Sequence, residues 1–255
     1  MSPFDLTGRV AVVTGGNGGI GLGMARGMAE AGAAIAVAGR NVRKSEAAAA
    51  ELAKLGVKTA VLNVDVASEA SCRKMIEDAA KALGRIDILV NNAGINIRKP
   101  ADQMALAEWK QVIDVNLTSA FICSHAAYPR MKEAGGGKII NIGSMLSIFG
   151  ASFAPAYGAS KGGVVQLTKA LAVAWAKDNI QVNAVLPGWI DTELTKKARA
   201  EVSGLNAMVL MRTPAKRWGT PEDIGRAVAA IAGDAFPFST GEVINVDGGF
   251  HLRRL

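Results

Sequence analysis

Short apolar runs alternate with longer amphipathic stretches along this 255-residue chain, and this alternation restricts the folds that it can adopt. Strands that are apolar throughout and separated by helices predict a parallel sheet covered by helices on both faces. The predicted fold is therefore α/β, a doubly wound parallel sheet in three α/β/α layers. The predicted strands are Arg9–Thr14, Ala33–Ala38, Lys58–Val64, Ile86–Val90, Lys138–Ile142, Gln181–Val185 and Val243–Val246. The predicted helices are Ile20–Ala31, Ser45–Leu55, Ser68–Leu83, Glu108–Lys132, Tyr157–Lys177 and one that opens at Thr220-Pro221.

The chain is expected to form a single domain over residues 1–255, because no proline- or serine-rich linker and no repeat divides it. The polar stretch at residues 192–217 is expected to be mobile and to form a lid that closes over substrate and excludes water. Half of the residues are apolar and a fifth are charged, which is ordinary for a soluble globular protein. No apolar run approaches the roughly 18 residues needed to span a bilayer, so no membrane partner is expected.

The formal net charge of +7 favours anionic ligands such as nucleotides, phosphates or an acidic carrier protein. The basic residues are dispersed along the chain, so nucleic-acid binding is not expected. Cys72 and Cys123 show no metal-type spacing and are expected to be free thiols in a reducing cytosol. The N-terminus lacks the basic start and apolar stretch of a secretory signal. These features predict a cytoplasmic protein with no metal site.

A glycine-rich turn joins the first predicted strand to the first predicted helix. Glycines permit a tight turn and let backbone amides approach a pyrophosphate, and the N-terminus of the following helix adds a partial positive charge. The spacing Gly15-x3-Gly19-x-Gly21 differs from the commoner three-glycine fingerprint, but its place between a strand and a helix predicts the dinucleotide-binding unit of a Rossmann fold. The residues expected to hold the cofactor here are Gly15, Asn17, Gly18, Gly19, Ile20 and Gly21.

The end of the second predicted strand bears on which dinucleotide binds. A site for NAD usually places a carboxylate there to hold the ribose 2′-hydroxyl, but this chain has Gly39-Arg40-Asn41. Arg40 can clamp an adenosine 2′-phosphate, although it can equally begin a solvated loop. Gly18 stands where a second basic residue would have strengthened the case. The cofactor prediction is NADP(H), with NAD(H) possible.

Ser144, Tyr157 and Lys161 form a candidate catalytic set. Tyr157 and Lys161 are four residues apart and share one helix face. A free tyrosine has a pKa near 10, and a nearby ammonium is expected to lower that pKa towards the working range. Ser144 follows a strand end, where its hydroxyl can hydrogen-bond a substrate oxygen. The set predicts acid/base chemistry at Tyr157 on a secondary alcohol or a ketone.

With these motifs, the chain resembles the short-chain dehydrogenase/reductase family over nearly its whole length. The matching elements are the glycine-rich turn, Asn91-Asn92-Ala93-Gly94, Asn116, Ser144, Tyr157-x3-Lys161 and Pro187-Gly188. The resemblance implies that Tyr157 exchanges a proton with the substrate oxygen and that Lys161 also holds the nicotinamide ribose. It implies that Ser144 orients the carbonyl and that Asn116 keeps a water in a proton relay behind Lys161.

The same resemblance implies further cofactor contacts. Asp65 and Val66 would contact adenine, and Asn91 would brace the sheet. The residues implied to line the rest of the cofactor are Asn41, Asn92, Ala93 and Gly94, with Pro187, Gly188, Ile190 and Thr192 at the nicotinamide end.

Substrate specificity in such a fold comes from the loops around the catalytic face. The stretch Ile95–Pro100 looks like the corresponding part of gluconate 5-dehydrogenases and related sugar-acid dehydrogenases. Arg98 near the pocket mouth can pair with a substrate carboxylate, although a solvated surface arginine is an equally good interpretation. The candidate substrate residues are Asn96, Arg98, Met145, Phe149, Phe153 and Trp189, and for the apolar ones ordinary core packing is the alternative.

Three functions remain open at this point. The first is a dehydrogenase of a sugar, polyol or sugar acid. The second is a 3-oxoacyl-carrier-protein reductase or a hydroxysteroid-type dehydrogenase, since the same motifs fit both. The third is a non-catalytic nucleotide-sensing protein, against which the intact Ser144, Tyr157 and Lys161 set argues. Relatives are usually tetramers, so a homotetramer is expected.

Overall fold

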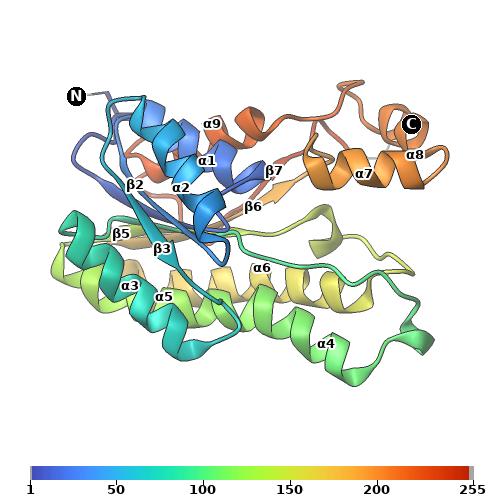
Figure 1. The fold of residues 1–255 in the computed structure, drawn as a ribbon, viewed down its shortest axis with the longest axis horizontal. Coiled ribbons are helices and arrows are strands. Elements are labelled where there is room, and N and C mark those ends of the chain that lie inside the picture. The colour runs from blue at the N-terminus through green and yellow to red at the C-terminus, as the bar shows by residue number, and fades with distance from the viewer. Residues whose placement is uncertain (1, 253–255) are drawn as a thin grey trace.

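The computed structural model describes residues 2–252, which form a seven-stranded sheet covered by helices (Figure 1). The strands are β1 (Val10–Thr14), β2 (Ala34–Gly39), β3 (Thr59–Asn63), β4 (Ile88–Asn91), β5 (Gly137–Ile142), β6 (Ile180–Pro187) and β7 (Val243–Val246). The longer helices are α1 (Gly19–Glu30), α2 (Val42–Ala53), α3 (Glu69–Leu83), α5 (Ser119–Glu133), α6 (Pro155–Trp175) and α9 (Pro221–Ala232). Shorter ones are α4 (Leu106–Ile113), α7 (Glu193–Glu201) and α8 (Leu205–Arg212).

The sheet has the strand order β3-β2-β1-β4-β5-β6-β7, and every pair of neighbours is parallel. The order reverses at β1. From β1 the chain adds β2 and β3 on one side, and it then returns to add β4 to β7 on the other side. In such a sheet a crevice opens at the carboxyl ends of the strands on either side of the reversal, and ligands bind there. The predicted doubly wound α/β/α fold is confirmed.

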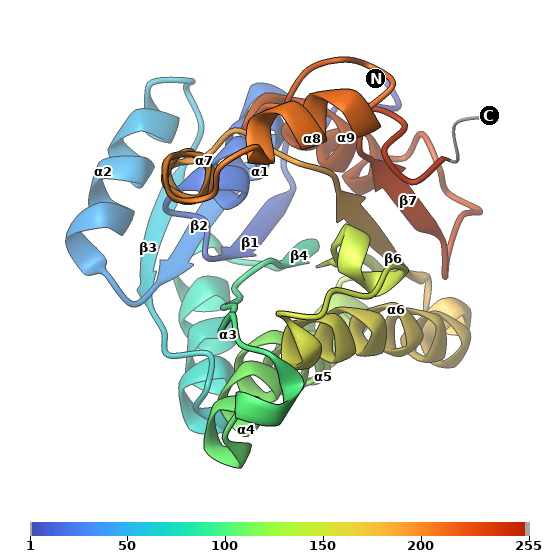
Figure 2. The same cartoon turned by 90° about the vertical axis from the view of Figure 1, so that its right-hand side faces the viewer.

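Two apolar layers sandwich the sheet. In Figure 2, α1, α2 and α9 lie on one side of the strands, and α3, α5 and α6 lie on the other. Met24, Met28 and Ile224 belong to the core of the first layer. Met75 and Met131 belong to the core of the second. Because both faces of the strands are covered, β1 is buried at all five residues, as the apolar run Val10–Val13 within it predicts.

Two segments differ from the sequence prediction. The expected helix Glu108–Lys132 is divided into α4, a π-helical segment η2 (Asp114–Thr118) and α5. A π-helical turn adds one residue to a helical repeat, which apolar periodicity alone does not reveal. The stretch at residues 192–217, predicted to be a mobile polar loop, contains the helices α7 and α8. Thr192 caps α7, because its side chain accepts a hydrogen bond from the backbone N–H of Thr195.

Among the helices of residues 2–252, none combines the length and the apolar character that crossing a membrane requires.

Candidate active site

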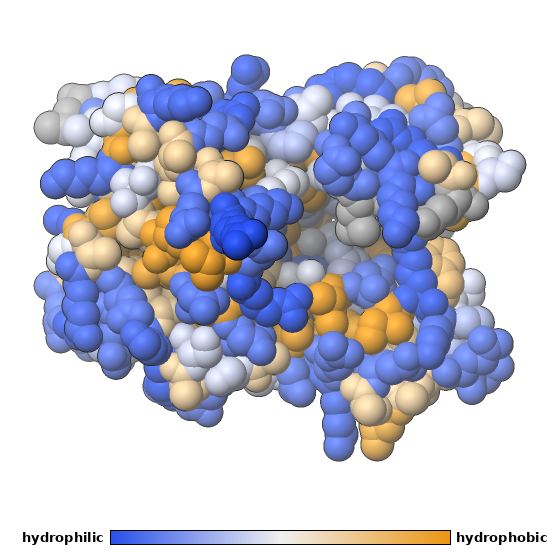
Figure 3. Space-filling model, in the orientation of Figure 1, coloured by the Kyte–Doolittle hydropathy of each residue, from blue (hydrophilic) through white to orange (hydrophobic). Residues whose placement is uncertain are grey.

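The crevice at the carboxyl ends of β1 and β4 is held together by Thr14. Its hydroxyl donates to the carbonyl of Val90 and accepts from the backbone N–H groups of Asn92 and Ala93, at 3.2, 2.9 and 3.1 Å. The Asn92 amide donates back to the Thr14 carbonyl at 2.9 Å. The end of β1 and the turn after β4 are therefore fixed to each other. Figure 3 shows the molecular surface hollowed between the α7 region and the elements below it.

The glycine-rich turn fits a bound dinucleotide. A Cβ on Gly21 would lie 2.1 Å from the carbonyl oxygen of Gly15, and a Cβ on Gly15 would lie 2.9 Å from the Asn92 side chain. Gly15 and Gly19 also have positive φ angles, of 65° and 53°, which favour glycine. No side chain caps α1 at Gly18, and its first turn carries no acidic residue. The start of α1, where Gly19 and Ile20 lie, is thus open to a pyrophosphate.

The adenosine end of the crevice lies where β2 and β3 finish. Arg40 and Asn41 directly follow β2, and both are exposed. Asp65 is exposed after β3, whereas Val66 is buried. Asn17 reaches from the glycine-rich turn towards the end of β2, because a Cβ on Gly39 would lie 2.5 Å from its amide nitrogen. The structure therefore gathers these predicted contacts at one end of the crevice.

The nicotinamide end is built by the segment after β6. Pro187 ends β6, and Gly188 follows it so close to the C-terminal turn that a Cβ would lie 2.6 Å from Cα of Asp247. Ile190 is buried and pairs with Gly219 in an isolated bridge. The Thr192 methyl lies 3.6 Å from the position of a Cβ on Gly19. The start of the predicted lid therefore meets the glycine-rich turn.

Ser144 and Tyr157 lie together at the catalytic face. Ser144 follows β5, and its hydroxyl accepts from the backbone N–H of Leu146 at 3.1 Å. Burial raises the pKa of Tyr157 above its ordinary value and outweighs a hydrogen bond with Ser144 and the positive charge of Arg98, which both lower it. The expected lowering of the pKa by Lys161 is therefore wrong for the protein groups alone. At neutral pH Tyr157 is protonated, the form that donates a proton to a ketone oxygen.

Lys161 approaches the tyrosine from the next turn of α6. Its ammonium donates to the carbonyl of Ile142 at 2.7 Å and lies 5.7 Å from the centre of the Tyr157 ring. The side chain is buried, and burial lowers the pKa of Lys161 to about 8. A Cβ on Gly94 would lie 3.6 Å from this ammonium and 3.2 Å from the Asn116 side-chain oxygen. Glycine at position 94 thus leaves room between Lys161 and Asn116.

Asn116 lies in η2, at the join between α4 and α5. Its side chain accepts from the Ile95 N–H at 2.8 Å and donates to the Ile95 carbonyl at 2.9 Å. It also donates to the Ser160 hydroxyl at 3.0 Å. The side chain therefore ties the loop after β4 to α6.

Asn91, by contrast, faces the interior of the sheet. Its amide donates to Asn141 at 2.8 Å and to Ser124 at 3.0 Å, and Asn141 donates to Thr168 at 2.9 Å. This buried chain of polar groups joins β4 and β5 to α5 and α6, the bracing position expected of Asn91.

The candidate substrate residues separate into two groups. Asn96, Arg98 and Phe153 are exposed on two loops that are joined by a hydrogen bond from Lys99 N–H to the Phe153 carbonyl, 2.9 Å long. Met145 is buried in a small cluster beneath the catalytic face. Phe149 and Trp189 pack against the same cluster and are only partly exposed.

The predicted lid is anchored at its base by arginines. Arg199 of α7 forms an ion pair with Asp191 and lies 4.4 Å from the Trp218 ring. The rings of Trp218 and Trp189 meet edge to face at 5.6 Å. Arg212 of α8 lies over Phe149 and Phe250, at 4.8 and 4.2 Å.

Two serines, which were not predicted from the sequence, position the catalytic residues. Ser147 accepts from the Ser144 N–H at 3.1 Å and donates to the Lys161 carbonyl at 2.8 Å, so it links two of the catalytic residues. Ser160 accepts the bond from Asn116 described above. The Ser144-x2-Ser147 spacing of a capping box was the available signal for the first. Nothing in the local sequence pointed to the second.

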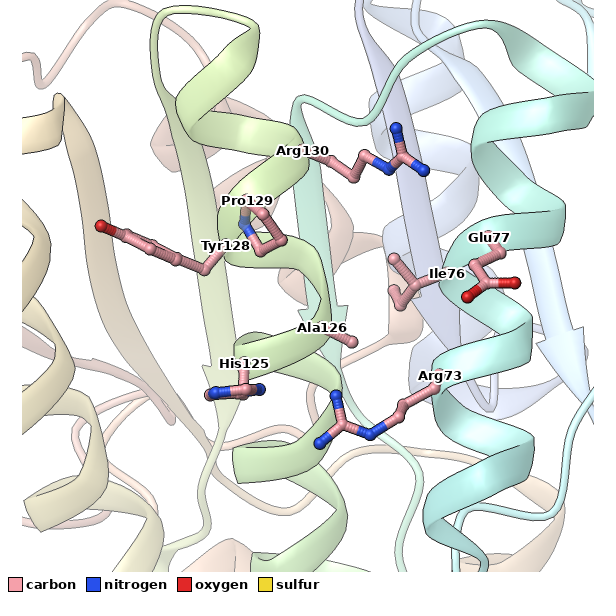
Figure 4. Close-up of a pocket in the computed structure, with 8 residues that line it drawn as sticks. All are labelled: Arg73, Ile76, Glu77, His125, Ala126, Tyr128, Pro129 and Arg130. Carbon is pink, nitrogen blue, oxygen red and sulfur yellow. The ribbon is translucent and has the colours of Figure 1, made fainter.

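A second hollow, of about 380 Å³, lies away from this site between α3 and α5 (Figure 4). It is lined by Arg73, Ile76, Glu77, His125, Ala126, Tyr128, Pro129 and Arg130. Arg73 is already paired with Glu69 at 2.7 Å. Tyr128 points away from α3 and donates to Asp178 at 2.8 Å. The hollow lies apart from Ser144, Tyr157 and Lys161 and is not the catalytic crevice.

The known proteins that this chain is similar to are named as reductases or dehydrogenases. Residues 15–251 match the family model described as Enoyl-(Acyl carrier protein) reductase. The 2-dehydro-3-deoxy-D-gluconate 5-dehydrogenase of Formosa agariphila is 41% identical over 96% of this chain and 94% of its own length. The 5-keto-D-gluconate 5-reductase of Escherichia coli K12 is 38% identical over 96% of both chains. The crystal structure of a gluconate 5-dehydrogenase from Burkholderia cenocepacia in complex with NADP and tartrate has a TM-score of 0.94 and 38% identity, covering 99% of this chain and 98% of that one.

Proposed function

The chain belongs to the short-chain dehydrogenase/reductase family, and on that premise we propose that it is an NAD(P)-dependent oxidoreductase that interconverts a secondary alcohol and a ketone on a sugar acid. The observation that carries the proposal is the meeting of Ser144, Tyr157 and Lys161 beside a crevice shaped for a dinucleotide. None of the three residues is needed by a protein that only senses a nucleotide.

Each residue has a distinct task in the reaction. Tyr157 donates its proton to the ketone oxygen in reduction and accepts a proton from the alcohol in oxidation. Ser144 donates a hydrogen bond to the same oxygen, and so stabilises the charge that develops on it. Lys161 would hold the nicotinamide ribose with its ammonium, which lies 5.7 Å from the centre of the Tyr157 ring. When bound, the nicotinamide cofactor supplies or accepts the hydride.

The cofactor is NADP(H) by preference, with NAD(H) as the alternative. Arg40 replaces the carboxylate that would hold a ribose 2′-hydroxyl, and its guanidinium suits a phosphate. The gluconate 5-dehydrogenase of Burkholderia cenocepacia was crystallised with NADP. The glycine-rich turn, with the open start of α1 behind it, is the part of the crevice that suits the pyrophosphate of either dinucleotide.

A sugar acid is favoured over a neutral sugar because of Arg98. This side chain is exposed on the loop after β4, yet its charge acts on Tyr157. A carboxylate on the substrate can therefore pair with Arg98 while the reacting oxygen lies against Ser144 and Tyr157. Exposed Asn96 and Phe153 are the other candidate contacts from these two loops.

The test is a substrate panel assayed with NADPH and NADH, containing keto-sugar acids, neutral keto sugars and a 3-oxoacyl thioester. Turnover of a keto-sugar acid is expected, and Arg98→Ala should raise its KM about tenfold because a charge-assisted contact is lost. Arg98→Lys should recover part of the affinity. The KM for a neutral ketone should change little.

Tyr157→Phe provides the inactive control. It should abolish turnover and leave dinucleotide binding nearly intact. Equal KM changes for charged and neutral ketones in Arg98→Ala would contradict the sugar-acid assignment. Turnover of the acyl thioester alone would favour a carrier-protein reductase, and full activity of Tyr157→Phe would contradict the mechanism.

We further propose that the protein acts in the cytoplasm as a homotetramer. The two cysteines are free and buried, which suits a reducing compartment. Apolar side chains such as Phe121 on α5 and Val173 on α6 are exposed in the single chain, and a neighbouring subunit would cover them.

A further inference from the structure

Position 18 in the glycine-rich turn carries no side chain, and Lys44 occupies the space that one would fill. A Cβ on Gly18 would lie 2.6 Å from Nζ of Lys44 and 2.9 Å from its Cε. Gly18 has an extended φ of 173°, which any residue adopts, so the only obstacle to a side chain there is the flexible end of Lys44. The ammonium therefore lies where a basic side chain at position 18 would begin.

The start of α2 is fixed in a way that directs Lys44 to this place. Asn41 caps the helix, because its side-chain oxygen accepts from the Lys44 backbone N–H at 3.0 Å. The Asn17 amide donates to the Ser45 hydroxyl at 3.0 Å, and Ser45 donates to the Asn41 carbonyl at 3.0 Å. These bonds join the glycine-rich turn to the first turn of α2. They hold the start of α2, and with it Lys44, beside Gly18.

Lys44 belongs to a group of cations without acidic partners. Arg40, Arg43 and Lys44 fall within five residues that contain no acid. Elsewhere in residues 2–252, no carboxylate forms an ion pair with any of the three, although Arg26 on the neighbouring helix pairs with Glu51 of α2. Unpaired cations that border a dinucleotide crevice attract a ligand with several negative charges.

We propose that Lys44, together with Arg40, binds the adenosine 2′-phosphate of NADP(H) and supplies from α2 the positive charge that Gly18 lacks. Arg40 offers a planar fork of donors directly after β2, and Lys44 offers a compact ammonium from the first turn of α2, beside Gly18. NAD(H) has a hydroxyl at that position and gains little from either charge. The inference rests on the proposed function, since it assigns a residue to its cofactor site.

The experiment measures dinucleotide affinity directly. NADPH and NADH are titrated into purified wild type and Lys44→Gln, and Kd is obtained from tryptophan fluorescence at low salt. Lys44→Gln should raise the Kd for NADPH about tenfold and leave that for NADH within about twofold, because only the phosphate contact is lost. Lys54→Gln removes the same charge from the far end of α2 and should change neither Kd.

A rescue variant separates the contact from a general structural effect. Gly18→Arg in the Lys44→Gln background places a cation on the other wall of the same space and should restore most of the NADPH affinity. If wild type binds both dinucleotides but Lys44→Gln leaves both Kd values unchanged, or raises both equally, the assignment of Lys44 is wrong. The proposed function is not affected by that result. Wild type that binds neither dinucleotide would overturn the proposed function as well.

Discussion

At the scale of single residues, Lys161 holds an ammonium in a position that is only 4% exposed. Its one hydrogen-bond acceptor within residues 2–252 is the Ile142 carbonyl, and burial lowers its pKa to about 8 from the 10.5 of a free lysine. In the unfolded chain the group keeps its proton up to the higher value. The folded state therefore carries a cost of about 3 kcal/mol below pH 8, and this cost disappears as the pH rises towards 10.5.

Lys161→Met is accordingly expected to abolish turnover and to raise the Tm of the cofactor-free protein at pH 7. The gain should shrink between pH 8 and pH 10, because the wild-type lysine loses its charge over that range. The difference in Tm between Lys161→Met and wild type is measured by thermal unfolding at pH 7 and pH 10, at fixed protein concentration. A gain of equal size at both values would mean that Lys161 carries no buried charge at pH 7.

At the scale of secondary-structure elements, α1 and α9 pack so closely that glycine is required where they cross. A Cβ on Gly225 would lie 2.2 Å from the Gly23 carbonyl oxygen, and a Cβ on Gly27 would lie 2.5 Å from the Gly225 carbonyl oxygen. Both contacts are with backbone atoms, which cannot rotate away as the end of a flexible side chain can. Since α1 also begins at the glycine-rich turn, this crossing holds the floor of the cofactor crevice in place.

Gly225→Ala is expected to destabilise the fold by about 2 kcal/mol or more, because the two helices must move apart. Gly162→Ala is the matched control. Its methyl group would meet nothing nearer than the Ser147 carbonyl oxygen at 3.9 Å, so within α6 it should stabilise by about 0.5–1 kcal/mol. Urea denaturation of both variants gives the comparison. Equal and small effects would mean that the crossing tolerates a side chain.

Some of the elements and site residues could be predicted from the sequence, and others could not. Strand β1 is predictable because its first four residues are apolar, and Tyr157 and Lys161 are predictable because four residues make about one helical turn. The π-helical segment that contains Asn116 could not be predicted, since its apolar spacing continues that of α4. Helix α7 was missed because it is polar and mostly exposed, although Thr192 gave a capping signal. Lys44 was missed because its meeting with Gly18 depends on how α2 lies against the glycine-rich turn.

At the scale of the whole molecule, the layer formed by α3, α5 and α6 leaves apolar side chains at its surface. Val173 on α6 is 84% exposed, and Phe121 on α5 is 47% exposed. Side chains this exposed leave much apolar surface in contact with water in the single chain. The proposed homotetramer gives these two helices a neighbour.

Light scattering is expected to give the mass of four copies of the 26.4 kDa chain. Val173→Asp should reduce the mass to that of a smaller species, because a carboxylate would be buried against an apolar partner. Leu55→Asp, on an exposed apolar residue after α2 in the opposite layer, should leave the mass unchanged. A wild-type protein that runs as a monomer would contradict the expectation.

The edge-to-face pair of Trp189 and Trp218 has a practical consequence. The two rings lie where the chain enters and leaves the predicted lid, and Arg199 of α7 is stacked on one of them. The other two tryptophans, Trp109 and Trp175, are in α4 and at the end of α6, outside residues 192–217. A shift of α7 moves a cation away from an indole ring and alters its emission. The pair would therefore report movement of the predicted lid, and stopped-flow fluorescence can test for that movement without attaching a dye.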